Sequence, residues 1–221
     1  MKAFAELLDR LVLTPSRNAK LKLLADYCAA TPDPDRGYAI AAITRDLDVM
    51  SVKPAMIRAL VAERVDEVLF AWSYDFVGDL AETVSLIWPE PLPPSVASGD
   101  ISPARGESGD LASATEVERR APFSPLAGVM SAQRTEGGLS AAPRISEIVE
   151  TLQKASRSDG PKLVARWLDE LDPSGRYALL KLITGGMRIG VSSRLMKQAL
   201  ADFGGKDVTQ IEELWHGLTP P

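Results

Sequence analysis

Apolar residues recur with the period of an α-helix on both sides of a non-periodic middle, and this pattern limits the possible folds more than any other feature. Phe4, Leu7, Leu8 and Leu11 fall at i, i+3, i+4 and i+7, which places four side chains on one helical face. Further stripes of this kind comprise Leu21, Leu24, Ala25 and Cys28; Met56, Ile57, Leu60 and Val61; Leu80, Val84, Ile87 and Trp88; Ile145, Ile148, Val149 and Leu152; Leu163, Trp167, Leu168 and Leu171; Leu195, Met196, Ala199 and Phe203; and Ile211, Leu214 and Trp215. The pattern predicts an all-α, multi-helix bundle with these residues in its core.

Residues that begin or end helices flank these stripes. A serine or aspartate that can cap a helix stands before several of them, and proline or a glycine pair follows others. The expected caps are Ser16, Asp79, Asp172, Ser192 and Asp207, the last with Gln210 in a capping-box pattern; the expected stops are Pro32–Pro34, Pro89, Gly185–Gly186 and Gly204–Gly205.

The middle of the chain has a different composition. Residues 91–143 contain 7 Pro, 6 Gly, 8 Ser and 9 Ala among 53 positions, with Phe123 as the one aromatic residue. Such a stretch cannot bury enough apolar area to offset its conformational entropy. We therefore predict a disordered insertion at 91–143 between two helical halves, residues 1–90 and residues 144–217.

Charge and cysteine content exclude several classes of protein. The net charge is −5, and residues 144–221 carry 11 basic against 10 acidic residues, so any nucleic acid would have to meet a localised basic face on an acidic body. The single cysteine, Cys28, excludes an intramolecular disulfide, and with the single histidine, His216, it excludes a Cys/His zinc site. Without a signal peptide or an apolar run of membrane length, we expect a soluble, cytoplasmic protein.

Motifs for catalysis are missing from the sequence. There is no Walker A loop and no GxGxxG segment. The tetrapeptide from Arg157 to Gly160 resembles the Lys-x-Asp-Gly motif of nucleotidyltransferases, in which a lysine amine attacks the α-phosphate of ATP. Arg157 stands in place of that lysine, and a guanidinium remains protonated near neutral pH. We predict neither a catalytic residue nor a metal site in this chain.

The segment from Leu180 to Ser193 carries the main functional signal. A helix ends there in glycines, a short turn follows, and a new helix begins at Ser192. Glycines let a backbone approach a ligand closely, and a helix start offers unpaired N–H groups to a phosphate. Lys181, Arg188 and Arg194 add positive charge. The segment is therefore a candidate phosphate cradle, although an ordinary turn between two helices favours the same residue types.

Three blocks of the sequence, in order, resemble the N-terminal DNA-binding domain of bacterial ATP-dependent DNA ligases. Thr14–Leu21 resembles the family's T-x-S-R…K block, Gly78–Glu82 its GDLG/GDLA block, and Gly186–Ser192 its LRIGV/LRIGL block. The sequence contains neither the family's adenylation lysine motif nor its OB-fold domain, and residues 218–221 resemble the start of the linker to the next domain. The resemblance implies a truncated ligase, an isolated domain or a split gene product.

The resemblance also implies a function and a set of site residues. In this family the helical domain binds nicked duplex DNA without sequence readout during strand-break sealing in repair, replication and recombination. The residues expected to contact DNA are Arg17, Lys20, Gly186, Arg188, Gly190 and Ser192 by motif, and Lys162, Ser193 and Arg194 by position. ATP and Mg²⁺ serve the full-length family, and no cofactor is expected here. We expect a monomer that is inactive as a ligase on its own.

An α-helical protein-interaction scaffold is the alternative interpretation. Stacked amphipathic helices are typical of helical repeats as well as of ligase DNA-binding domains. A regular internal period would favour the scaffold, and the sequence has none.

Overall fold

Helices form the whole of the regular structure in the described residues. The computed structural model describes residues 1–47, 49, 52–89 and 142–217, and within them there are eleven helices and no strand, so the all-α prediction is confirmed. The helices are α1 (Lys2–Leu13), α2 (Arg17–Ala30), α3 (Asp35–Thr44), α4 (Pro54–Ala62), α5 (Glu67–Val77), α6 (Leu80–Ile87), α7 (Ile145–Lys154), α8 (Gly160–Glu170), α9 (Pro173–Thr184), α10 (Ser193–Gly204) and α11 (Val208–Trp215).

The predicted stripes supply most of the core. Phe4, Leu8 and Leu11 of α1 are at most 1% exposed, because the i, i+3, i+4, i+7 spacing directs them to one side of the helix. The buried cluster continues through α2, α4 and α6 and through α7 to α10. The last stripe is less buried than predicted, since α11 has no buried residue and Leu214 is 66% exposed.

The predicted caps also form. Side-chain oxygens of Ser16, Asp79, Asp172, Ser192 and Asp207 each accept a hydrogen bond from a backbone N–H in the first turn of the following helix. These bonds satisfy donors that helix geometry leaves without a partner. At Asp207 the donor is the N–H of Thr209, and not that of Gln210 as a capping box would require.

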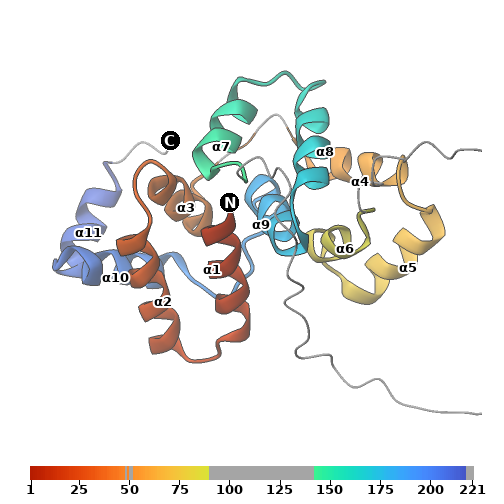
Figure 1. Cartoon of the computed structure of the whole chain (residues 1–221). Helices are drawn as coiled ribbons and strands as arrows, with labels where there is room; N and C mark the ends of the chain where they lie inside the picture. Colours follow the sequence, from red (N-terminus) through yellow and green to blue (C-terminus); the bar gives the residue numbers. More distant parts are fainter. Residues whose placement is uncertain (48, 50–51, 90–141, 218–221) are drawn as a thin grey trace, which may run out of the picture. The chain divides into compact units, whose positions relative to one another are not determined.

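Helices from the two ends of the sequence are interleaved. The strongest packing between elements joins α2 to α10, α6 to α9 and α1 to α9, and α3 contacts α7 while α4 contacts α8. Figure 1 shows α9 next to α1 and α6, and α10 beside α2. Each of these pairs takes one helix from residues 1–89 and one from 142–217, so neither segment has a complete core of its own.

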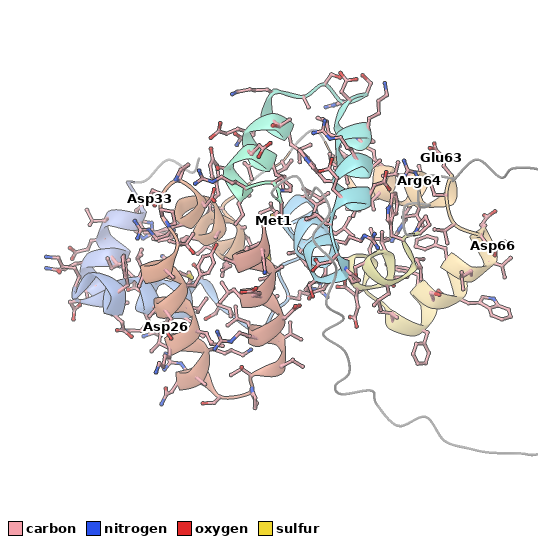
Figure 2. The ribbon with its side chains drawn as sticks, viewed as in Figure 1. Met1, Asp26, Asp33, Glu63, Arg64 and Asp66 are labelled. Atoms are coloured by element: carbon pink, nitrogen blue, oxygen red, sulfur yellow. The ribbon has the colours of Figure 1, made fainter. Side chains whose placement is uncertain are left out.

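The amino terminus also links the two segments. The Met1 ammonium group donates a hydrogen bond to the Pro143 carbonyl oxygen at 2.7 Å, and Figure 2 marks Met1 at the start of α1. Burial lowers the pKa of this amine, and the negative charge of Asp35, which raises the pKa, does not fully offset that effect. The prediction of disorder at 91–143 concerns residues that, apart from Ala142 and Pro143, lie outside the described ones, as do residues 218–221. No described helix is long and apolar enough to span a membrane.

Candidate functional site

The turn between α9 and α10 alternates buried and exposed side chains. Met187, Ile189 and Val191 are 1%, 2% and 9% exposed, whereas the residues between them, Arg188 and Gly190, face solvent. The Arg188 N–H donates to the Gly186 carbonyl oxygen at 2.7 Å, which tightens the start of the turn. Three apolar anchors therefore fix the turn to the core, and its opposite edge presents Arg188, Gly190 and then Ser192.

A buried lysine of α2 holds this turn in place. The Lys20 ammonium donates to the carbonyl oxygens of Ile189, at 3.2 Å, and Gly190, at 3.0 Å, and Lys20 is only 9% exposed. Gly190 has a φ of 68°, and a Cβ built there would crowd the Lys20 Nζ. The left-handed backbone favours glycine at 190, and a side chain there would also force the end of the lysine to shift.

Two helix starts lie at the same place. Ser16 Oγ accepts from the Ala19 N–H at 3.4 Å at the start of α2, and Ser192 Oγ accepts from the Leu195 N–H at 3.2 Å at the start of α10. Helix geometry leaves the other first-turn N–H groups without intrahelical acceptors, and they carry a partial positive charge. Because the starts of both helices line the same hollow, their partial charges act on the same space.

A basic hollow lies between these elements. It encloses about 840 Å³ and is lined by Pro15, Arg17, Lys20, Ile43, Thr44, Arg45, Met187, Arg188, Gly190, Val191, Ser192, Ser193 and Leu195. Four of these residues are basic and none is acidic. Among the residues that the structure describes, none forms an ion pair with Arg17, Arg45 or Arg188. The hollow is thus a concentrated positive surface on a chain whose net charge is −5.

Arg45 is a site residue that the sequence analysis missed. It follows α3 in the left-handed conformation, with a φ of 67°, and its N–H donates to the Ala42 carbonyl oxygen. A non-glycine residue in this conformation is uncommon and costs about 1 kcal/mol or more. No family block covers Arg45, and only the packing of α3 against α10 brings it to the hollow.

The structure brings most of the predicted site residues together. Arg17, Lys20, Arg188, Gly190, Ser192 and Ser193 line the hollow. Gly186 and Arg194 are sequence neighbours of these residues without lining the hollow themselves. Lys162 lies apart, on α8, where its 78%-exposed side chain pairs with Asp159 at 3.7 Å.

The block from Gly78 to Glu82 has a structural role in this fold. Gly78 ends α5 with a φ of 72°, and Asp79 caps α6 and accepts a hydrogen bond from the Lys181 ammonium at 2.6 Å. Burial alone would raise the pKa of Asp79, but hydrogen bonds from Lys181 and from the N–H groups of α6 outweigh it and hold the pKa below its usual range. Lys181 is 3% exposed, so the expectation that it adds charge to the cradle is wrong.

Other side chains with possible chemistry are in ordinary structural surroundings. Arg157 belongs to the turn between α7 and α8, where Ser156 Oγ accepts from the Asp159 N–H at 3.1 Å. The Cys28 thiol is fully buried, and burial raises its pKa to about 11. In the described part of the chain, no three His, Cys, Asp or Glu residues are grouped as metal ligands would be.

Comparison with known proteins relates the chain to a DNA ligase. No protein-family model matches the chain. It is 24% identical over 222 aligned positions to a protein of Opitutus terrae described as "Probable DNA ligase". That alignment covers 95% of this chain and 21% of the relative, so the chain spans about a fifth of the relative's length. The similarity supports a relationship between this chain and DNA ligases.

Proposed function

We propose that this chain binds double-stranded DNA through the basic hollow and does not read its sequence. The observation that supports this most is the group of Arg17, Arg45 and Arg188 around one concavity, without an acidic residue in its described lining. Phosphate groups supply the negative charge that such a surface attracts, and they dominate the affinity of proteins for duplex DNA.

The kinds of donors at the hollow favour contacts to the DNA backbone. Arginine side chains, the Ser192 hydroxyl and the first-turn N–H groups of α2 and α10 are the groups that typically bind phosphate oxygens. The exposed edge of the turn at Gly190 lets the DNA backbone come close. Such contacts set position and orientation and carry no sequence information.

The similarity to a DNA ligase supports a more specific function for this chain. We propose that the chain is the DNA-binding module of an ATP-dependent ligase and that it holds nicked duplex while another domain carries out adenylation and sealing. The three sequence blocks support this assignment, because two of them converge on the hollow and the third, at Asp79, supports α6 against α9. The role of this module would be to hold the duplex on either side of a strand break.

A binding titration with labelled duplexes tests the proposal. Fluorescence anisotropy is recorded with an intact duplex, the same duplex carrying one nick, and a duplex of unrelated sequence, each from 50 to 300 mM salt. With Arg17, Arg45 and Arg188 each neutralising one phosphate, the slope of log K against log salt should be roughly −3, at about −0.9 per neutralised phosphate. The unrelated duplex should bind equally well.

A matched set of variants connects the binding to the hollow. The triple variant Arg17→Ala, Arg45→Ala, Arg188→Ala should flatten the salt slope by about three. The control is Arg166→Ala, which removes an exposed arginine that pairs with Glu170 on α8. If the control weakens binding as much as the triple variant does, the hollow is not the DNA site. A preference for nicked over intact duplex tests the ligase part of the proposal separately.

A further inference from the structure

Helix α5 presents a continuous apolar face to solvent. Val68, Leu69, Trp72 and Phe76 are 58%, 53%, 75% and 92% exposed. Their spacing places them on one side of the helix, since residues three and four apart are neighbours on a helical surface. Isolated exposed apolar residues are common, but a row that contains a tryptophan and a phenylalanine is typical of an interaction surface.

The other side of α5 is fixed to the protein. The Phe70 and Tyr74 rings lie 6.0 Å apart, and Phe70 packs against the core. Arg58 of α4 donates to the Tyr74 hydroxyl at 3.0 Å and lies 5.1 Å from the centre of its ring. Asp66 caps the start of α5 and the left-handed Gly78 ends it. The apolar face is therefore held in a defined orientation outward.

Carboxylates border this face. Glu63, Asp66, Glu67 and Asp75 are all exposed, and the sequence of α5 contains no lysine or arginine. Figure 2 shows Glu63 and Asp66 around the turn that joins α4 to α5. The nearby Arg64 is held by Asp169, with N–O distances of 2.7 and 2.9 Å, and lies over the Trp88 ring. These four carboxylates outnumber the two nearby arginines, Arg58 and Arg64, so the surroundings of the apolar face are negative on balance.

We propose that α5 is a docking surface for a basic, amphipathic helical segment of a partner protein. Apolar residues of that segment would cover Trp72 and Phe76, which belong to the residue types that contribute most at the centre of interfaces. Its lysines or arginines would lie opposite the carboxylates, and complementary charges select such a partner. DNA and anionic lipid are disfavoured here because their phosphates would meet these carboxylates.

This inference goes beyond the proposed DNA-binding function and uses different residues. None of the residues that line the basic hollow belongs to α4 or α5. DNA binding and partner docking can therefore fail independently in an experiment.

A pair of designed peptides tests the docking surface on the whole 221-residue chain. The first is an 18-residue helix with leucine at i, i+3, i+4 and i+7 and lysine at most other positions; the second has glutamate in place of lysine. Binding is measured by anisotropy of the labelled peptides, and burial of Trp72 by its emission maximum, using Trp72→Phe to subtract the other three tryptophans. We expect the basic peptide to bind at least tenfold more tightly than the acidic one and to shift the Trp72 emission to shorter wavelength.

Variants on exposed positions separate the α5 face from general attraction to an acidic protein. Trp72→Ala with Phe76→Ala should weaken binding of the basic peptide at least tenfold, and Glu67→Gln with Asp75→Asn should weaken it severalfold and reduce its salt dependence. The control, Val12→Ala with Leu13→Ala, alters two residues of α1 that are 52% and 82% exposed and should leave binding unchanged. Circular dichroism confirms that all variants fold.

Four results would overturn the proposal. They are equal binding of both peptides, binding that survives Trp72→Ala with Phe76→Ala, Trp72-dependent binding to phosphatidylserine vesicles, and protection of Trp72 from acrylamide quenching in the chain alone. The last result would mean that a second copy, or another part of the chain, already covers the α5 face; sedimentation equilibrium distinguishes these two cases.

Discussion

The Lys20 ammonium donates hydrogen bonds to the carbonyl oxygens of Ile189 and Gly190, two residues that lie about 170 positions away in the sequence. A buried cation that is bound to carbonyl groups contributes more than an exposed one, because both it and its acceptors would otherwise lie partly buried without partners. We therefore propose that Lys20 acts on the candidate site mainly by fixing the turn that presents Arg188, rather than by contacting phosphate directly.

Replacing Lys20 should separate this positioning role from direct DNA contact. We expect Lys20→Met to lower the free energy of unfolding by about 1–3 kcal/mol, since two carbonyl groups lose a charged donor. It should weaken duplex binding while changing the salt slope by much less than one, because no phosphate-neutralising charge is lost. Urea denaturation and salt titration measure the two effects. A slope that falls by a full unit would show that Lys20 contacts phosphate directly.

A side chain at Gly190 should displace the Lys20 ammonium. The Cβ of Gly190→Ala would crowd Nζ, and a shift of the lysine end would strain its hydrogen bonds to the two carbonyl oxygens. The left-handed backbone adds about 1–2 kcal/mol for alanine. We expect a total loss of about 2–4 kcal/mol in the free energy of unfolding. In a Lys20→Ala background the same substitution should cost only the backbone part, and a double-mutant cycle measures the difference.

The apolar stripes of the sequence predict most of the helices and miss α3 and α5. In α5, Phe70 packs against the core while Trp72 and Phe76 are exposed, so no single apolar stripe marks the helix. In α3 the buried residues are largely alanines, which give little contrast with the exposed positions. Periodicity detects a helix only when its two faces differ in hydrophobicity.

The sequence predicts several residues of the candidate site but not the contacts between them. Family blocks identify Arg17, Lys20 and Arg188, but they do not show that Lys20 and Gly190 are in contact. Arg45 reaches the hollow through the packing of α3, a contact between elements distant in sequence. The place of Lys162 near a helix start predicts a DNA contact, but Lys162 lies on α8, paired with Asp159. Local pattern supplies the residue types, whereas tertiary packing decides which of them meet.

The Asp79–Lys181 pair should make the fold sensitive to acid. The pKa of Asp79 lies below the value of about 3.9 expected in an unfolded chain. The contribution of the Asp79 carboxylate to the free energy of unfolding is therefore fully present above about pH 5. It is lost as the pH falls through the folded-state pKa. Asp79→Asn should lower the free energy of unfolding at pH 7 by about 1–3 kcal/mol and flatten its dependence on pH between about 5 and 3.

A second carboxylate supplies the comparison for this experiment. Burial alone would raise the pKa of Asp35, but hydrogen bonds from Ser146 and Arg144 outweigh it and lower the pKa. Part of the acid dependence should thus remain in Asp79→Asn and diminish further when Asp35→Asn is added. Denaturant titrations at pH 3.5, 5 and 7 provide the data. An unchanged pH dependence in Asp79→Asn would show that the pair does not couple to folding.

Arg45 offers the clearest separation of stability from DNA binding. Its left-handed backbone, with a φ of 67°, is strained for arginine and free of strain for glycine. Arg45→Gly should therefore raise the free energy of unfolding by up to about 1 kcal/mol, or leave it unchanged where the chain entropy of glycine offsets the gain. The same substitution removes a cation from the hollow, so duplex affinity should fall and the salt slope should flatten by about one.

Arg45→Ala is the matched control, because it removes the same charge and keeps the strain. Both variants should lose the same affinity, and only Arg45→Gly should match or exceed the wild-type melting temperature. Equal affinity of Arg45→Gly and wild type for duplex DNA would exclude Arg45 from the proposed site.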